Sequence, residues 1–571
     1  MFILFREVFD RAFKHDWNKW LALFGVAWYG LHTANSETIN YISARSELLS
    51  TALVIIALVS YIRSPFMRKY FLYLVPFVLG VLAKPPAFMF VPLLFIYLLF
   101  FEEDSCIPPT GRRAAGRAFL RSMVRCLPAV IAALMFLQIT ASQFASLEKE
   151  PVSYFNYLIS QFFVALYYFK SFFLPIGLSV DYGWSSLNGV FHFTFLAGFI
   201  FVVSMLISAY LFYRQKKYRP IAFGILWFFI ALIPTSFIPL TELLNDHRMF
   251  FPFVGLMMAV CWLVGLGLYK YEEKLKTIPI LKVIIISIGI IILLANALGT
   301  YSRNRVWKDE ESLWHDVILK NAENSRGLMN YGLTQWNKGR LDVALKYFLA
   351  AKKRAPNYAY ACINLGTLYG ALNNSREAEA NYKQALMCGK NFNGSYYYYA
   401  RWLVGQGRQD EAIPLLIKSI ELSPPFLSDR QLLLTIYESQ KKYDLATIIA
   451  QQILEIDPTD KNAWQYLIVH KSPLLNLGKA KPTPETCLAI SLICHRQGKY
   501  RECILAAEEA IKLRPNYAEA YNNIGAAYNS MHQWDRAIAP LEKAIALKPD
   551  FQLAKNNLAL AKSQKAKAGK P

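Results

Sequence analysis

Four short polar segments interrupt the long apolar runs in the first half of this sequence, and each carries residues that could do chemistry. They combine carboxylates, which can accept a proton, with lysine, arginine and histidine, which can hold a phosphate through charge-assisted hydrogen bonds. The segments are His32–Glu37 followed by Arg45 and Glu47, Lys84–Pro86, Val180–Trp184 and Glu242–Arg248. If they meet on one face, they predict a site for an anionic head group.

A second interpretation needs no such site. Charged side chains at the ends of membrane spans reach the interface at little cost, so snorkelling and helix caps also explain these segments. The eight cysteines include no CxxC pair, so we predict neither a metal site nor a disulfide framework.

The elements that must position these residues are apolar runs long enough to cross a hydrocarbon core, which takes about 17–25 residues of helix. Residues 1–16 mix charged and aromatic side chains, which predicts a cytoplasmic amphipathic segment. A membrane domain at 17–300 follows. We predict about nine spans in it, near 17–33, 45–62, 70–84, 87–101, 126–146, 190–213, 220–238, 250–269 and 280–299.

One further apolar stretch, Ser153–Leu178, does not fit this count. Lys170, Pro175 and Gly177 break it, so we expect a re-entrant or interfacial helix pair on the outer face. Counting it as a simple crossing would place the basic loop Arg214–Arg219 on the wrong side of the membrane.

Basic residues fall in alternate loops, which the positive-inside rule assigns to the cytoplasm. The net charge of +22 is therefore explained largely by span orientation, and we predict no nucleic-acid partner. With nine crossings, the four polar segments and the second half of the chain lie outside. We predict an integral protein of a bacterial inner membrane or an equivalent membrane, with that second half on the periplasmic or lumenal face.

The second half has the pattern of a repeat array. Pro424 and Pro458 lie 34 residues apart, as do Pro515 and Pro549, and this is the period of the tetratricopeptide repeat. We predict a linker at 301–324, six repeats at 325–551 with an insertion at 461–483 that contains Pro473, and a capping helix with a basic tail at 552–571. The predicted fold is all-α: a multi-spanning membrane domain followed by an α-solenoid.

Stacked repeats leave a concave groove that commonly holds an extended peptide. Tyr396–Tyr399 and Trp402 enrich one part of the array with aromatic side chains. They favour a polypeptide acceptor or partner in the groove, although packing between helices explains the same residues.

Several stretches also resemble one known family. The stretch HTANSETINYISARSELLS from His32 resembles the loop of the transmembrane and tetratricopeptide repeat-containing O-mannosyltransferases, in which HPxHTEA precedes GRA[DE]LL. Similar likenesses occur in YFKSFFLPIGLSVDYGW, in WFFIALIPTSFIPLTELLNDHRMFFPFVG and in WKDEESLW before the first repeat. The resemblance implies a C-type glycosyltransferase, which transfers a sugar from a polyprenyl-phosphate donor to an outward-facing acceptor.

The resemblance also implies roles for the polar residues. Glu37 matches the loop glutamate of the family, and Asp246 matches a family glutamate. The catalytic residue is unassigned, with Glu37 and Asp246 as its candidates. The implied donor-phosphate-binding residues are Arg45, Lys84, His247 and Arg248, and the implied outer-face motif comprises His32, Asn35, Glu47 and Asp181.

The chain departs from the family at its front. The His32 motif follows the third span of the family but the first span here, so we expect this chain to lack the first two spans and the acidic catalytic loop between them. The family pattern therefore favours a truncated chain or one part of a split enzyme.

Two functions from different classes follow. One is a glycosyltransferase-like membrane protein that transfers a mannose-like sugar from a polyprenyl phosphate to Ser or Thr of exported polypeptides presented by the repeats. The polyprenyl-phosphate sugar is then its donor substrate, and no other cofactor is predicted. The other is a non-catalytic membrane scaffold whose repeats recruit protein partners at the outer face.

Overall fold

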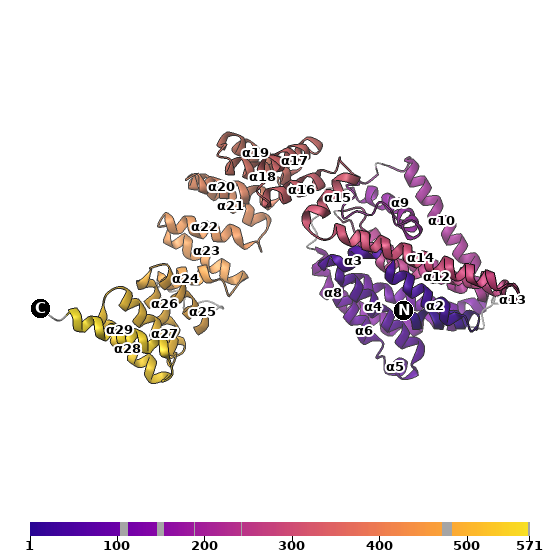
Figure 1. Cartoon of the computed structure of the whole chain (residues 1–571), viewed down its shortest axis with the longest axis horizontal. Coiled ribbons are helices and arrows are strands. Elements are labelled where there is room, and N and C mark those ends of the chain that lie inside the picture. Colours follow the sequence, from indigo (N-terminus) through magenta and orange to yellow (C-terminus); the bar gives the residue numbers. More distant parts are fainter. Residues whose placement is uncertain (103–111, 146–152, 188, 241, 471–481, 569–571) are drawn as a thin grey trace. The chain divides into compact units, whose positions relative to one another are not determined.

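A computed structural model of the protein describes residues 1–102, 112–145, 153–187, 189–240, 242–470 and 482–568. These residues form helices and connecting loops, and none of them belongs to a strand. The chain divides into two compact units, Met1–Arg354 and Ala355–Pro571 (Figure 1). The prediction of an all-α fold is confirmed.

The first unit contains the membrane helices and the first repeat. Its helices are α1 (Phe2–Ala12), α2 (Asn18–Leu31), α3 (Ser36–Asn40), α4 (Arg45–Arg63), α5 (Pro65–Lys69), α6 (Leu74–Ala83), α7 (Phe90–Tyr97), α8 (Arg112–Ala145), α9 (Tyr154–Phe173), α10 (Phe193–Tyr213), α11 (Arg219–Phe237), α12 (Phe250–Lys270), α13 (Glu272–Thr277), α14 (Pro279–Val306), α15 (Glu310–Lys320), α16 (Ser325–Asn337) and α17 (Leu341–Arg354). Short 3₁₀ helices at Thr33–Asn35 (η1), Pro85–Met89 (η3) and Asp246–Met249 (η6) join some of them.

Among the residues that the structure describes, seven of the predicted spans are long and apolar enough to cross a membrane: Ile42–Arg63, Pro85–Glu102, Gly116–Leu137, Phe193–Tyr213, Lys216–Phe237, Asp246–Lys270 and Pro279–Val306. The other two predicted spans correspond to α2 and α6, which have only 14 and 10 residues. Even so, α2 runs antiparallel to α12, because its two ends contact the two ends of that helix. Asn18 accepts a hydrogen bond from Tyr269, and Tyr29 donates to the Phe250 carbonyl.

The stretch at 153–178 forms one continuous helix, α9, and the expected helix pair is wrong. Lys170 lies in the last turn of α9. Pro175 and Gly177 follow the C-terminal end of α9 and therefore do not interrupt the helix. Both ends of α9 contact one face of the bundle. Tyr157 donates to the Thr235 carbonyl at 2.6 Å, and Tyr168 donates to the Asn245 carbonyl at 3.0 Å. These contacts favour an interfacial helix over a membrane crossing.

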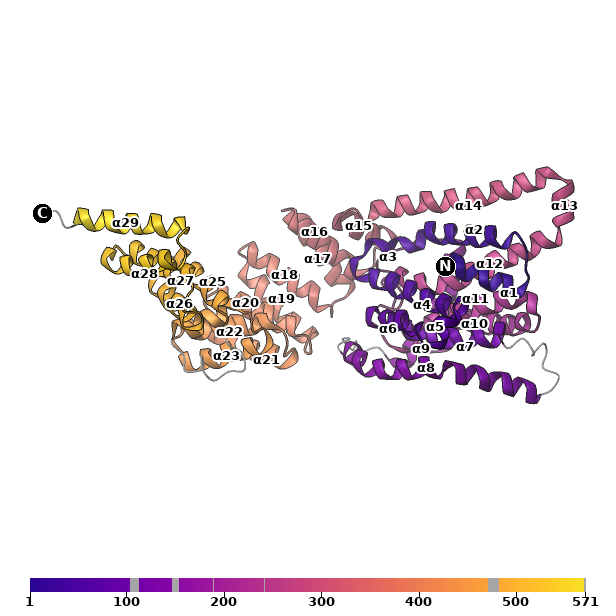
Figure 2. The ribbon, with the colours of Figure 1, turned by 90° about the horizontal axis from the view of Figure 1, so that it is seen from below.

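The amphipathic N-terminal helix α1 packs against protein. Leu4, Phe5, Val8 and Phe9 are fully buried, and α1 contacts α2, α4 and α11. Its apolar stripe is thus covered by neighbouring helices, which anchor it at the end of the bundle where α2 and α14 begin. Figure 2 shows α2 and α14 running side by side toward the opposite end.

The repeats are helix pairs. After α16 and α17 in the first unit, the second unit contains α18 (Ala359–Ala371), α19 (Ser375–Cys388), α20 (Asn393–Gly405), α21 (Gln409–Leu422), α22 (Leu427–Ser439), α23 (Tyr443–Ile456), α24 (Lys461–Val469), α25 (Pro484–Arg496), α26 (Tyr500–Leu513), α27 (Ala518–Ser530), α28 (Trp534–Leu547) and α29 (Gln552–Ala568). The helix α24 begins the predicted insertion, whose Pro473 lies outside the described residues. Small residues let the paired helices approach closely. At Gly525, for instance, an added Cβ would lie 2.3 Å from Leu541 Cγ.

Candidate functional site

Two buried carboxyls, each paired with a neighbouring side chain, lie at the end of the bundle where α2 and α14 finish. We call these two contacts the acid pairs and this end of the bundle the site face. The Glu37 carboxyl in α3 shares a 2.8 Å hydrogen bond with His247 Nδ1 in η6. Beside His247, Asp246 accepts a 2.5 Å hydrogen bond from the Tyr182 hydroxyl. The side chains of Glu37 and Asp246 are each only 1% exposed. The residues come from three segments far apart in the sequence, so the fold itself assembles the pairs.

Burial sets the electrostatics of Glu37. It raises the pKa of this carboxyl from its ordinary 4.5 to about 8, and the positive charge of Arg303 opposes the rise. Burial, followed by the charge of Asp246, also raises the pKa of the Tyr182 hydroxyl, which therefore stays a hydrogen-bond donor. A carboxyl that titrates near neutral pH can act as a general base or acid.

A third pair lies between α4 and the end of α6. Lys84 Nζ contacts Glu47 Oε1 at 2.9 Å, and Glu47 is 5% exposed. Arg248 also has partners, since its guanidinium donates to the Glu242 and Leu243 carbonyls. Arg45 is exposed, and its guanidinium donates to the Ile39 carbonyl rather than to Glu37 or Asp246.

The outer-face motif holds the loops in place. His32 is hydrogen-bonded to the Phe172 carbonyl at 2.9 Å, and Asn35 donates to the Tyr29 carbonyl at 2.7 Å. Asp181 accepts from the Gly183 amide within its own turn at 2.8 Å. His32 therefore connects the end of α2 to the end of α9, while Asn35 and Asp181 stabilise the turns in which they lie.

The first repeat also contacts the site face. Asn321 donates to the Tyr182 carbonyl, and Asn324 donates to the Asp181 carbonyl. Arg326 pairs with Asp181 and Glu242. The start of the repeat array thereby fastens the loop that presents Tyr182 to Asp246.

Sequence reasoning missed Tyr182 and Arg303. Tyr182 stands beside the predicted Asp181, but nothing in the order of residues signals its contact with Asp246, 64 positions further on. Arg303 lies three residues before the end of the last span, where an arginine is expected as an interface anchor. It is instead buried, and pairs with Asp316 of α15 at 2.6 Å.

Comparisons with known proteins match both halves of the chain. Tetratricopeptide-repeat family models match residues 311–359, 359–387, 492–532 and 518–551. A protein of mouse, "Protein O-mannosyl-transferase TMTC3", is 25% identical over 503 residues, which cover 77% of this chain and 52% of that protein. The human protein of the same name is 24% identical and is covered to 53%.

The chain is related to the protein O-mannosyl-transferases of this family. It spans about half the length of the two relatives just described. A further human relative, "Protein O-mannosyl-transferase TMTC1", is 25% identical over 232 residues. The resemblance predicted from the sequence motifs is therefore confirmed, as is a membrane protein with tetratricopeptide repeats.

Solved structures similar to the chain are repeat proteins. A tetratricopeptide repeat protein from Parabacteroides merdae is 17% identical, with 51% of this chain and 98% of that protein covered and a TM-score of 0.27. YrrB, described as a repeat protein with an unusual peptide-binding site, is 18% identical, with coverages of 43% and 96% and a TM-score of 0.18.

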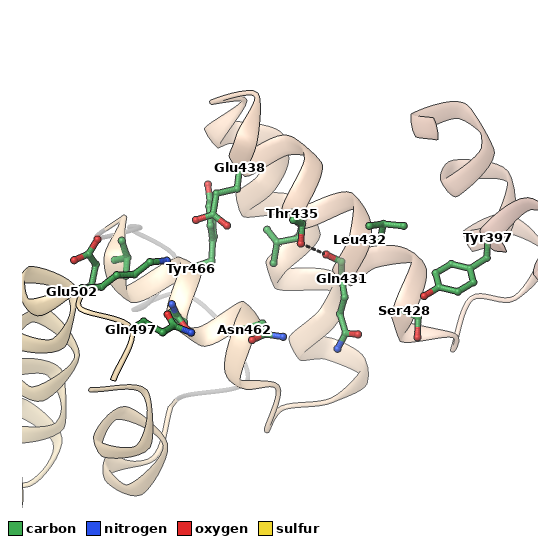
Figure 3. A pocket seen from close by; sticks show the side chains of 14 residues that line it. Tyr397, Ser428, Gln431, Leu432, Thr435, Glu438, Asn462, Tyr466, Gln497 and Glu502 are labelled. Carbon is green, nitrogen blue, oxygen red and sulfur yellow. Dashed lines mark hydrogen bonds between the residues drawn. The ribbon is translucent and has the colours of Figure 1, made fainter. Parts of the chain in front are cut away.

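The repeats of this chain provide a second candidate site. A pocket of about 510 Å³ lies among α22, α24 and the start of α26 (Figure 3). Its lining is polar, with the amides of Gln431, Asn462 and Gln497 and the carboxylates of Glu438 and Glu502. Such groups can pair with the backbone of an extended peptide.

Two roles are predicted from the sequence for the aromatic residues near this pocket, contact with a peptide and packing between helices. Each role is met by one of them. Tyr397 lines the pocket, as Figure 3 shows. Tyr399 is 5% exposed and stacks on Tyr382 with ring centroids 5.6 Å apart, so it packs between α19 and α20.

Proposed function

We propose that this protein is a membrane glycosyltransferase of the O-mannosyltransferase kind. It binds a polyprenyl-phosphate sugar at the site face and transfers the sugar, a mannose or a close analogue, to Ser or Thr of an exported polypeptide. The observation that carries the proposal is that two buried carboxyls, Glu37 beside His247 and Asp246 beside Tyr182, lie on the face where the repeat array begins. The relationship to protein O-mannosyl-transferases supports it.

The chemistry needs a proton acceptor and a stabilised leaving group. The acceptor hydroxyl forms a bond to the anomeric carbon, the bond from that carbon to the phosphate oxygen breaks, and a carboxylate takes the hydroxyl proton. Glu37 suits the last role, because its pKa of about 8 makes it basic enough to hold the proton. Lys84 and Arg248 are the predicted contacts for the negative charge on the departing polyprenyl phosphate.

Donor binding tests the proposal first. The full chain in lipid nanodiscs is titrated with polyprenyl-phosphate mannose, and we expect saturable binding. Lys84→Ala and Arg248→Ala should each weaken it by about tenfold to a hundredfold, since a charge-assisted phosphate contact is worth about 1.5–3 kcal/mol. Lys282→Ala, at the exposed opposite end of α14, is the matched control and should bind like the wild type.

Thermal unfolding in the same preparations separates lost binding from lost folding. This matters for Lys84, because its removal leaves the buried Glu47 without its ionic partner. A wild-type chain that binds no polyprenyl-phosphate mannose would contradict the proposal outright.

The repeat pocket is proposed to hold the polypeptide acceptor. Its polar lining is suited to main-chain hydrogen bonds, which select an extended segment with little demand on its sequence. Transfer to a Ser/Thr-rich peptide, read by mass spectrometry, should fall when Gln431 and Asn462 are both changed to Ala.

The same pocket favours one alternative function, a scaffold that gathers protein partners without transferring sugar. The mass of the bound peptide distinguishes the two functions, because it increases only when a hexose is transferred to the peptide. A peptide that binds the repeats and gains no hexose, in the presence of bound donor, would favour the scaffold.

A further inference from the structure

Arg303 is a buried cation with an unused hydrogen-bonding edge. Its side chain is 6% exposed, and Nη1 donates to Asp316 Oδ2 at 2.6 Å. Its Nε and Nη2 atoms are also buried, and neither has a hydrogen-bond partner among the described residues. Because an unpaired buried charge-bearing donor costs free energy, this edge indicates a missing partner.

Unpaired acceptors occur on the segments next to it. Within the part of the chain that the structure describes, Glu37 Oε2, Asp246 Oδ2, Asn35 Oδ1 and Asn245 Oδ1 are buried without a hydrogen-bond partner. Asn35 lies in η1, Glu37 in α3 and Asp246 in η6, and Asn245 directly precedes η6. These three elements contact one another.

The end of α14 lies against the same segments. It contacts both η1 and α3, and Asn40 of α3 donates to Asn304 at 2.7 Å, directly beside Arg303. The charge of Arg303 also acts on the pKa of Glu37, opposing its rise. Unused donors and unused acceptors therefore gather in one polar region of the site face.

The two kinds of unused atom restrict the ligand. The guanidinium edge requires an anion, and a planar fork of N–H groups matches phosphate oxygens. The amide oxygens of Asn35 and Asn245 require O–H or N–H donors, which a simple inorganic anion such as sulfate lacks. A sugar phosphate supplies both, through its phosphate oxygens and its hydroxyl groups.

Lys84 and Arg248, the two phosphate contacts already proposed, also have partners within the protein. Lys84 contacts Glu47, and the Arg248 guanidinium donates to two backbone carbonyls. Arg303 differs from both because its free edge is enclosed by protein.

We propose that Arg303 binds the phosphate of the lipid-linked sugar donor, while the Glu37 and Asp246 carboxyls form hydrogen bonds with the hydroxyl groups of its sugar. This inference rests on the proposed function and specifies the donor site within it. Arg303 is held from its other side by Asp316 of α15, so the segment leading into the first repeat supports the donor-binding side chain.

The experiment compares two lipids and three variants in nanodiscs. Arg303→Lys keeps the positive charge but loses the fork of N–H groups, and it should weaken both polyprenyl phosphate and polyprenyl-phosphate mannose about tenfold or more. Glu37→Gln should weaken only the mannose-bearing lipid, because its altered group faces the sugar. Arg305→Lys, two residues further along α14 and exposed, is the matched control and should bind both lipids like the wild type.

Binding of both lipids to folded Arg303→Lys with wild-type affinity would overturn the inference. If the wild type itself binds no lipid-linked sugar, the proposed function fails instead, so the two failures are distinguishable. A second measurement needs no variant: a polyprenyl phosphate with a photoreactive group next to the phosphate should label the peptide that contains Arg303. Labelling of the wild type confined to other segments would also overturn the inference.

Discussion

Tyr182 reaches Asp246 because the backbone turns sharply directly after it. Gly183 has a φ of +63°, and a Cβ added there would lie 2.9 Å from Asn324 Nδ2. A side chain at this position would therefore be strained and would also meet the first repeat. Glycine at position 183 therefore allows the loop to approach Asn324 closely, while the Tyr182 hydroxyl reaches Asp246.

Removing the Tyr182 hydroxyl should destabilise the site face. Tyr182→Phe leaves the buried Asp246 carboxyl without a hydrogen-bond partner, which costs about 1–3 kcal/mol. Unfolding of the full chain by denaturant in micelles measures the loss. Tyr210→Phe, an exposed tyrosine on α10, is the control and should change the free energy of unfolding by less than about 0.5 kcal/mol. Equal effects of the two substitutions would contradict the role of the hydroxyl.

Glu37 should make the protein less stable as the pH rises. Its pKa is about 8 in the folded chain and 4.5 in the unfolded chain, so between these values the folded state binds more protons. The free energy of unfolding then falls with increasing pH across this window and levels off above it. Glu37→Gln, which is always neutral, should reduce this slope between pH 5 and pH 8.

Unfolding temperatures measured across that pH range provide the test. Glu310→Gln, at an exposed position in α15, is the control and should keep the wild-type slope. A Glu37→Gln protein with an unchanged slope would show that this carboxyl ionises alike in both states.

At the scale of elements, the loop at 178–182 depends on the first repeat for its position. Arg326→Glu would place a third carboxylate beside Asp181 and Glu242, and repulsion should loosen this loop. We expect faster hydrogen exchange of the amides at 178–183 in the variant. The double reversal Arg326→Glu with Glu242→Arg should restore part of the protection.

Arg340→Glu provides the comparison, because its partner Glu311 lies within the linker and repeat segment. It should leave exchange at 178–183 unchanged. The same increase in both charge reversals would contradict a specific contact between Arg326 and the loop.

The close approach of paired repeat helices gives a prediction for the second unit. Gly525→Ala forces a methyl group against Leu541 and should destabilise α27 and α28 by about 1–3 kcal/mol. Gly405→Ala is the matched control, since no atom lies within 4 Å of its added Cβ. Hydrogen exchange should quicken in α27 and α28 only for the first substitution; protection equal to the wild type would contradict the packing role of Gly525.

Much of the architecture could be predicted from sequence because period and length are local signals. Apolar runs identified the long spans, and the spacing of Pro515 and Pro549 identified the repeat. The α9 prediction failed where a local signal was misassigned: Pro175 and Gly177 lie beyond the helix end, not within it. The site was predictable only in part, since Glu37 and Asp246 stand in visible polar segments, whereas Tyr182 and Arg303 gain their roles from contacts across the fold.

At the scale of the whole chain, basic residues mark the ends of several spans on one side of the bundle. The end of the bundle opposite the site face carries Arg63 at the end of α4, Arg219 at the start of α11 and Lys270 at the end of α12. The site face carries the buried acid pairs together with Lys84, Arg248 and Arg303. From the positive-inside rule we predict that this basic end faces the cytoplasm and that the site face lies outside.

The orientation of the site and the repeats is a single prediction, because none of the described residues after Val306 forms a helix with the length and hydropathy of a span. The chain leaves α14 at the site face, so we predict that the repeats lie on the same side of the membrane as Glu37 and Arg303. We expect alkaline phosphatase fused after Asn557 to be active and a fluorescent protein that matures only in the cytoplasm to be dark there. Fusions after Thr277, at the end of α13, should give the reverse pattern, since that loop joins the basic ends of two spans. An inactive phosphatase after Asn557 together with an active one after Thr277 would place the acid pairs in the cytoplasm, where no exported acceptor could reach them.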